Sequence, residues 1–290
     1  MYLSIDFEDF NHDFKRSLGI WKTGPLKADV LWEKYNIINK VFKSNSSEEG
    51  RIGTFFCTGV IAQKEPELIK KISNDGHEIA CHYNYHDVMK GKSEYEIEKN
   101  LAEAKNSLEE ASGKSLHGFR APYFAIDKKN PYQYKIVEKL FTYDSSFICT
   151  TKDELTKFKS KMKLKKLKIL PIFQKKISKF TFRLGGSYLK MFPYSYSKWM
   201  MEMSKKNGFI PHIYLHPYEF GRNINVRRAM ELDSPRLKKL ICWLRWNLGR
   251  NKIENLIKQL NNLDKVKFEM FCTSKFNFRK IVKVYLLFNQ

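Results

Sequence analysis

Short apolar segments rich in β-forming residues alternate with longer segments of helical periodicity along the first 220 residues. The candidate strands lie at 2–5, 53–57, 77–82, 118–120 and 211–216, and the candidate helices lie at 30–42, 66–72, 93–111 and 134–140. Repeated alternation of this kind predicts a parallel α/β sheet or barrel, because each helix returns the chain to begin the next strand in the same direction.

Local signals define some of these elements more closely. Ser93 is a suitable N-cap and Glu96 follows three residues later, which is the sequence of a capping box. Gly113 is placed to end that helix. Further along, the segment 235–260 is helical and basic, and 267–273 is another strand candidate.

Composition adds a strong positive charge to this picture. The chain has 53 Lys and Arg residues against 31 Asp and Glu residues, a formal net charge of +22. The segment 152–179 alone holds eleven lysines and two acids. Such a charge favours contact with an anionic glycan, lipid phosphates or nucleic acid, although a solvated face is the simpler interpretation of the lysine-rich segment. No recognisable nucleic-acid motif accompanies it.

Cysteine usage and hydropathy bear on compartment and domain count. The five cysteines are scattered and form no CxxC pair, which favours a reducing compartment. We see no signal-peptide pattern and no apolar run of about 18 residues, so we expect a cytoplasmic protein. Without a clear linker, we expect one domain over 1–290, with its motifs in 1–222 and a basic helical extension over 223–290 packed on it.

Two groups of polar residues stand directly after candidate strands. Asp6 and Glu8 alternate, so a continued strand would direct both to one side, and Asp9 follows. A bound cation or a catalytic base would explain these acids, and so would a solvated turn. His82 and His86 are spaced so that a helical turn could present both to one metal ion. Their position after a strand is where parallel α/β folds place their sites.

Three further segments follow strands and are weak by themselves. Arg120 precedes Ala-Pro-Tyr123, and an arginine fork can hold a carboxylate, but taken alone the segment is better explained as an ordinary turn. Asp144 fits a solvated loop, and His216 fits a structural histidine. The remaining histidines that we considered, His12, His77, His117 and His212, have no predicted role.

Together these five segments resemble the polysaccharide deacetylases of the NodB-homology family, carbohydrate esterase family 4. The resemblance is closest to the subgroup that begins D-x-E-D, here at 6–9, and ends Y-L-H-P-x-E, here at 214–219. It implies a distorted (β/α) barrel of about seven strands. It also implies a metal-dependent hydrolase that removes N-acetyl groups from an N-acetylhexosamine-containing polysaccharide or lipid-linked glycan intermediate.

The resemblance implies a role for each residue of the first two motifs. Asp6 corresponds to the catalytic base, and His82 and His86 correspond to metal ligands. The family usually has two adjacent aspartates in the first motif, whereas Phe stands here in the second place. The third ligand is therefore Glu8 or Asp9, and strand alternation favours Glu8. The implied metal is zinc, and cobalt, nickel or iron would also suit these ligands.

The later motifs complete the implied site. Arg120 would orient the base, and the backbone N–H of Tyr123 would help to bind the oxyanion. Asp144 would pair with His216, the general acid. Tyr123 and Tyr85 are candidates for lining the sugar site, with core packing as the alternative.

The resemblance implies a glycan substrate. The basic charge favours in addition an anionic membrane surface or a lipid-linked sugar at the inner face of the membrane, and without a recognisable motif we expect no specific nucleic acid. Two alternatives to a glycan deacetylase remain open. One is another C–N amide hydrolase on the same scaffold, of the allantoinase type. The other is a catalytically inactive carbohydrate-binding protein.

Overall fold

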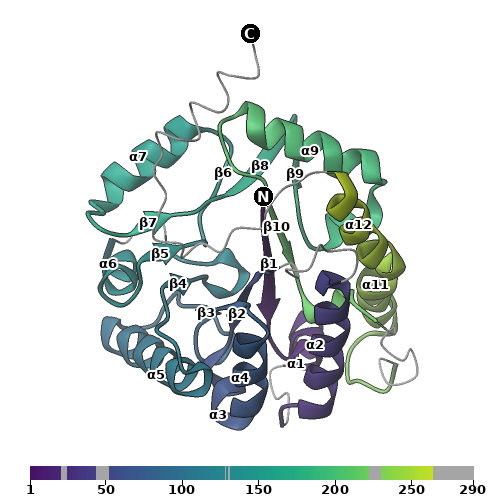
Figure 1. Ribbon diagram of the computed structural model, residues 1–290, viewed down its shortest axis with the longest axis horizontal. Coiled ribbons are helices and arrows are strands. Elements are labelled where there is room, and N and C mark those ends of the chain that lie inside the picture. Colours follow the sequence, from purple (N-terminus) through teal and green to yellow (C-terminus); the bar gives the residue numbers. More distant parts are fainter. Residues whose placement is uncertain (21–24, 44–51, 128, 130, 222–229, 264–290) are drawn as a thin grey trace.

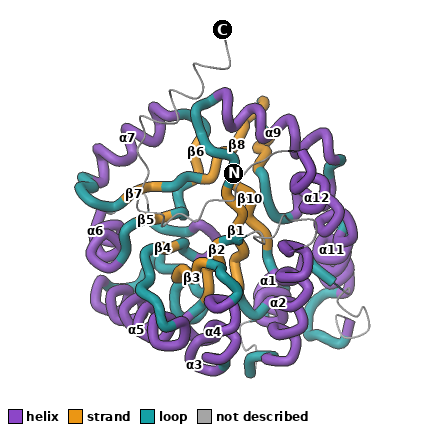
Figure 2. The backbone as a smooth tube through the Cα atoms, viewed as in Figure 1, coloured by secondary structure: helices purple, strands orange, loops and turns teal. Residues whose placement is uncertain are grey.

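Seven parallel strands form a curled sheet at the centre of the molecule, with helices around it (Figures 1 and 2). The computed structural model describes residues 1–20, 25–43, 52–127, 129, 131–221 and 230–263. From one edge to the other, the strands are β10 (His212–Leu215), β1 (Tyr2–Phe7), β2 (Thr54–Cys57), β3 (Glu78–Cys81), β4 (Gly118–Phe119), β5 (Tyr143–Asp144) and β7 (Lys168–Ile169).

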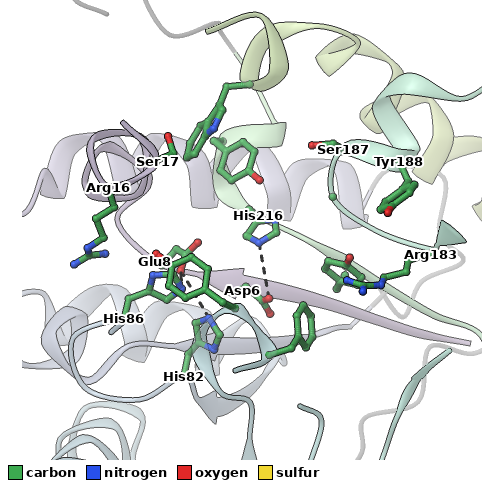
Figure 3. Close-up of a pocket in the computed structure, with 16 residues that line it drawn as sticks. Asp6, Glu8, Arg16, Ser17, His82, His86, Arg183, Ser187, Tyr188 and His216 are labelled. Carbon is green, nitrogen blue, oxygen red and sulfur yellow. Dashed lines mark ion pairs between the residues drawn. The ribbon is translucent and has the colours of Figure 1, made fainter. Parts of the chain in front are cut away.

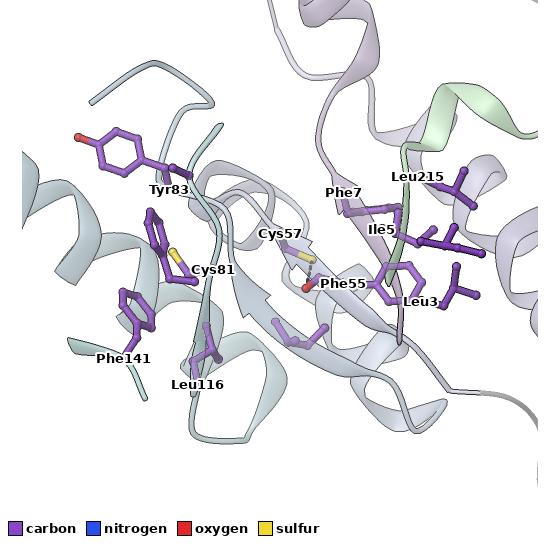
Figure 4. Packing of buried hydrophobic residues seen from close by; sticks show 14 of the residues in the cluster. Leu3, Ile5, Phe7, Phe55, Cys57, Cys81, Tyr83, Leu116, Phe141 and Leu215 are labelled. Atoms are coloured by element: carbon purple, nitrogen blue, oxygen red, sulfur yellow. Dashed lines mark hydrogen bonds between the residues drawn. The ribbon is translucent and has the colours of Figure 1, made fainter. Parts of the chain in front are cut away.

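The amino-terminal strand β1 lies between β10 and β2 and is buried along its whole length. Ile5 is in register with Leu215 on one side and with Phe55 on the other. Leu3, Ile5 and Phe7 share one face of β1 and pack in the main hydrophobic core (Figure 4). Side-chain alternation therefore directs the intervening polar residues of β1 to the opposite face, inside the curled sheet.

A second, smaller sheet follows the main one and contains β6 (Ile148–Cys149), β8 (Ile172–Ile177) and β9 (Phe180–Arg183). Strands β8 and β9 are an antiparallel hairpin. Beyond β9 the chain pairs with β10 through a parallel bridge between Gly185 and Tyr214. This bridge connects the second sheet to the edge strand of the first, so the ends of β9 and β10 lie side by side.

Most helices lie outside the strands (Figure 1). They are α1 (Phe10–Ser17), α2 (Ala28–Lys43), α3 (Gly59–Lys64), α4 (Pro66–Asn74), α5 (Glu94–Ser112), α6 (Pro131–Leu140), α7 (Lys152–Met162), α8 (Ser187–Met191), α9 (Tyr194–Lys206), α11 (Arg236–Asn247) and α12 (Arg250–Leu263), with short 3₁₀ turns η1 (Pro122–Phe124) and η2 (Pro217–Glu219). The predicted capping box is confirmed, since Ser93 and Glu96 cap α5 reciprocally, and Gly113 ends the helix in the left-handed conformation.

The basic segment predicted as helical over 235–260 is two helices, α11 and α12. They are separated at Gly249, whose φ of +72° suits glycine and interrupts helical geometry. Helix α12 contacts α2 and α8. The strand candidate at 267–273 lies outside the described residues, and the single-domain arrangement of 1–290 stays a prediction.

The architecture confirms the predicted α/β fold class, a distorted (β/α) barrel built on about seven parallel strands. The four cysteines within the described residues are free thiols, as their spacing predicts. Among the helices of the described ranges, none combines the length and the apolarity needed to span a bilayer.

Candidate active site

A cleft of about 610 Å³ opens at the carboxyl ends of the central strands. Asp6 and Glu8 reach it from β1, His82 and His86 from the loop after β3, and His216 from the end of β10 (Figure 3). Residues more than 200 positions apart therefore face one cavity. The carboxyl ends of parallel strands meet at one edge, which is where α/β folds bind their ligands.

Glu8, His82 and His86 form a compact, buried cluster. One ligand atom from each lies within 4.8 Å of the other two. Glu8 Oε2 is 3.7 Å from His82 Nε2 and also contacts His86 Nε2. One carboxylate and two imidazoles converging in this way fit a divalent transition metal with further coordination positions toward the cleft.

The loop after β3 brings the two histidines together without a helical turn. The chain bends over 84–86, and both Tyr83 and His86 have positive φ angles, of 65° and 54°. The first backbone N–H groups of α3 hold this bend, with Gly59 N donating to the Tyr83 carbonyl at 2.9 Å. Gly59 is required there, because a Cβ would lie 2.4 Å from Asn84 Oδ1. The predicted proximity of the histidines is thus reached by a different local conformation.

Hydrogen bonding sets the orientation of His82. Its Nδ1 lies 2.7 Å from the Arg120 carbonyl oxygen, which can only accept, so Nδ1 carries the proton. Nε2 then presents its lone pair toward Glu8, the arrangement typical of metal-ligating histidines. Burial lowers the pKa of His82 to about 3, which keeps the imidazole neutral and able to coordinate a metal.

Asp6 forms an ion pair with Arg120, whose side chain is fully buried. Burial by itself would raise the pKa of Asp6, but the adjacent guanidinium, together with the nearby His82 and His216, outweighs this effect and holds the pKa below its usual value. Asp6 Oδ2 also lies 3.9 Å from His216 Nε2. Asp6 is therefore an ionised carboxylate between the Glu8 cluster and His216.

The guanidinium of Arg120 is held on several sides by polar groups that belong to none of the sequence motifs or carry no role predicted from them. Arg120 Nη1 donates to Ser4 Oγ at 2.9 Å, and Nη2 donates to Ser145 Oγ and His212 Nε2, both at 3.0 Å. The ring of Phe56 stacks on Arg120 with its centroid 3.9 Å from Cζ. The only sequence signal for Ser4 and His212 is a polar residue in an otherwise apolar strand, which does not reveal the partner.

His216 has a different carboxylate partner from the one the resemblance implied. Glu219 Oε2 lies 3.6 Å from His216 Nδ1 and accepts the backbone N–H of His216 at 2.9 Å. Asp144 instead accepts hydrogen bonds from the backbone N and the hydroxyl of Ser146. The short η2 turn thus brings Glu219 back onto the imidazole ring, and the pairing of Asp144 with His216 stays a prediction.

The charge near His216 favours the imidazolium. Burial would lower its pKa, but the Glu219 carboxylate, followed by the charges of Asp6 and Glu8, raises it to about 9. A histidine in this state holds a proton at neutral pH that it can donate to a leaving group.

The other predicted residues are placed as follows. Tyr123 lines the cleft with a φ of +56°, and its ring lies on His86 with centroids 4.7 Å apart. Asp9 accepts the backbone N–H of Lys27 at 3.0 Å and is not part of the Glu8 cluster. Tyr85 does not line the cleft, since the loop leaves its side chain about half exposed.

Family models cover two successive parts of this chain. Residues 46–137 match the model described as polysaccharide deacetylase, and residues 141–271 match one described as a domain of unknown function, DUF3473. Over 79 residues, the chain is 32% identical to chitooligosaccharide deacetylase of Azorhizobium caulinodans, a match that covers 27% of this chain and 38% of that relative. Over 70 residues, it is 34% identical to peptidoglycan-N-acetylmuramic acid deacetylase PdaA of Bacillus subtilis, which covers 24% and 27%. The chain thus spans less than two-fifths of the length of these curated relatives.

Solved structures share the fold at low sequence identity. A protein from Mycobacterium smegmatis assigned as a polysaccharide deacetylase superposes with a TM-score of 0.56 at 17% identity, covering 98% of this chain and 90% of that one. An allantoinase superposes with a TM-score of 0.52 at 14% identity, covering 93% and 87%. The family match over residues 46–137, the two relatives and the shared fold agree with the motif resemblance, so over this part of its length the chain is similar to the polysaccharide deacetylases.

Proposed function

We propose that the protein is a metal-dependent N-deacetylase that hydrolyses the acetamido group of an N-acetylhexosamine-containing glycan. The observation that carries this proposal is the convergence of Glu8, His82 and His86 to within 4.8 Å in the cleft that also holds Asp6 and His216. A metal-binding triad, an ionised carboxylate and a protonated histidine are the groups that amide hydrolysis requires.

Glu8, His82 and His86 would hold the metal, which we propose to be zinc, with cobalt, nickel or iron as substitutes. When bound, such a metal supplies Lewis acidity that lowers the pKa of water and polarises a carbonyl group. Asp9, the other candidate ligand from sequence, is engaged with the backbone of Lys27.

The remaining residues would transfer the protons. Asp6 accepts a proton from the attacking water, and Arg120 keeps Asp6 ionised and fixed. The water oxygen adds to the acetamido carbonyl carbon, and the C–N bond then breaks. His216 donates its proton to the departing nitrogen, so that acetate and a free amino sugar are released. The backbone N–H of Tyr123, which borders the same cleft, is the proposed oxyanion donor.

The lining of the cleft supports a sugar substrate. Aromatic side chains of Tyr123, Tyr188, Tyr214, Tyr218 and Trp246 contribute to its walls. Their apolar faces and polar edges suit pyranose rings, which present both kinds of surface. Tyr85, which does not line the cleft, is not included in this proposed sugar site.

We also propose that the enzyme acts at an anionic membrane surface, on a lipid-linked or membrane-held glycan. Helix α11, which also places Trp246 in the cleft, exposes Leu237 and Ile241, at 68% and 55%, and Leu248 directly after the helix is 61% exposed. The segment 236–263 contains seven basic residues and one acidic residue. An exposed apolar face with basic neighbours suits the interface of an anionic bilayer.

The decisive experiment measures acetate release from N-acetylhexosamine oligosaccharides together with metal content. His82→Ala should lose both the metal and all turnover, whereas the control His117→Ala should keep both, since His117 lies away from the cleft. Glu8→Gln should lose metal and Asp9→Asn should retain it. Unchanged metal content in His82→Ala would refute the assignment of the site.

The same samples distinguish the competing functions. A cyclic-amide hydrolase, which the allantoinase-like fold permits, would open small ring amides and release no acetate from glycans. An inactive carbohydrate-binding protein would bind the oligosaccharide and leave it unchanged. The ionised Asp6 and the protonated His216 favour the active hydrolase over the inactive form.

A further inference from the structure

Two arginine side chains line the cleft, Arg16 near the Glu8 cluster and Arg183 on the opposite side (Figure 3). Arg183, at the end of β9, lines the same cavity as Asp6 and His216. In Figure 3, Arg183 and the Glu8 cluster are on opposite sides of His216. A substrate whose acetamido group meets His216 would therefore extend toward either the Glu8 side or the Arg183 side of the cleft.

The backbone of Arg183 is fixed in place. The hydroxyl of Tyr196 donates to the Arg183 carbonyl at 2.7 Å and lies 3.1 Å from the Arg183 N–H. Two residues later, Gly185 pairs with Tyr214 of β10. Gly185 is necessary for this approach, because a Cβ would lie 2.4 Å from the Tyr214 ring.

The guanidinium is also oriented by neutral neighbours. Gln174 Oε1 accepts from Nε and Nη2 of Arg183, at 3.4 and 3.3 Å, and Tyr214 forms a side-chain hydrogen bond with Arg183. The Tyr214 ring in turn contacts His216, with centroids 6.2 Å apart. The Tyr214 side chain therefore contacts both the Arg183 guanidinium and His216, the residue at which the acetamido group would react.

Among the described residues, no carboxylate lies within ion-pair distance of Arg183. The neighbours that hold it accept only part of its fork of five N–H donors. A rigid guanidinium facing an open cleft, with donors left over, is the geometry that recognises carboxylate and phosphate groups.

We infer that Arg183 binds an acidic group, a carboxylate or a phosphate, on the glycan next to the acetylated sugar. This inference rests on the proposed function, because it assumes that the acetamido group reacts at His216. Tyr214, Gln174 and Gly185 position Arg183 for that role. The substrate class is then an anionic glycan, not a neutral one.

The first test compares two forms of one oligosaccharide in which N-acetylglucosamine alternates with glucuronic acid. One form is native, and in the other the carboxyl groups are reduced to alcohols. Wild-type enzyme should show a kcat/KM at least about tenfold higher for the native form. Arg183→Gln should bring this ratio close to one, and Arg183→Lys should give an intermediate ratio because it keeps the charge without the fork. The control Lys176→Gln removes an equal charge from an exposed site on β8 and should keep the wild-type ratio.

The second test measures binding without turnover, using the fluorescence of Trp246, which lines the cleft. Wild-type protein is titrated with glucuronate, glucose 6-phosphate and glucose. Stronger binding of glucuronate supports a carboxylate partner, and stronger binding of glucose 6-phosphate supports a phosphate partner. Equal binding of all three overturns the inference even if Arg183→Gln fails to fold.

The outcomes separate this inference from the proposed function. Acetate release at equal rates from both oligosaccharide forms would refute the role of Arg183 and leave the deacetylase proposal standing. Absence of acetate release from every glycan would refute the deacetylase proposal, and the fluorescence titration, repeated with Arg183→Gln, would still decide whether Arg183 binds an anion.

Discussion

Replacing Glu219 with glutamine should move the alkaline limit of activity to lower pH. Glu219 is the carboxylate beside His216, with Oε2 3.6 Å from Nδ1. Glutamine has nearly the same size, and its amide oxygen can still accept the backbone N–H of His216, which Glu219 accepts at 2.9 Å. The substitution therefore removes a charge while keeping the turn that holds the histidine.

The size of the effect follows from the pKa of His216. Burial opposes protonation, and Glu219 is the strongest of the groups that together raise the pKa from 6.5 to about 9. That difference corresponds to about 3 kcal/mol in favour of the imidazolium. If loss of Glu219 removes about half of it, the pKa falls to about 7.5 to 8. At pH 8 the protonated fraction would then drop from about nine-tenths to between a quarter and a half.

The direction of the pH effect follows from the role of the proton. A general acid must be protonated, so activity is lost as the pH rises through the pKa of His216. In Glu219→Gln this loss should begin about 1 to 1.5 pH units earlier, while activity below about pH 6 should resemble that of wild type.

The assay is a kcat profile for acetate release between pH 5 and 10, with metal content measured on each sample. Asp144→Asn is the matched comparison, because Asp144 is the partner that the family resemblance implied and Ser146 is its neighbour here. Asp144→Asn should leave the alkaline limit in place. If Asp144→Asn moves it and Glu219→Gln does not, Asp144 acts on His216 and the reasoning from this structure is wrong.

Two further predictions concern stability and membrane binding. Burial opposes ionisation of Asp75, but hydrogen bonds from Lys71, Tyr35 and Lys43 hold its pKa below the ordinary value. The ionised Asp75 therefore stabilises the folded protein above about pH 4, and this contribution is lost as the pH falls. Asp75→Asn should thus lower the free energy of unfolding by about 1–2 kcal/mol at pH 7 and by much less at pH 3, measured by urea denaturation; equal stability at pH 7 would contradict this. The double substitution Leu237→Glu and Ile241→Glu should abolish co-sedimentation with phosphatidylglycerol vesicles, and a wild-type protein that ignores such vesicles would remove the membrane proposal.

The sequence by itself determined the elements and their class. Alternating strand and helix periods predicted the parallel α/β barrel, and the Ser93–Glu96 capping box predicted where α5 begins. These features are local, since capping and hydrophobic periodicity depend on residues within a few positions of one another. The sequence also placed Asp6 and His82 at strand ends, where such folds gather their polar residues.

Only the tertiary structure decided which polar groups meet. It put Glu8 beside the histidines while Asp9 turned to Lys27, and it gave His216 the carboxylate of Glu219. It also brought Arg183 into the cleft from a segment with no motif. The physical reason is that each pairing depends on strand register and loop conformation over separations that can exceed 200 residues, such as the 208 between Ser4 and His212. Local periodicity does not determine contacts between residues so far apart along the chain. Strand register and close packing in the interior determine these contacts only when the whole sheet has formed.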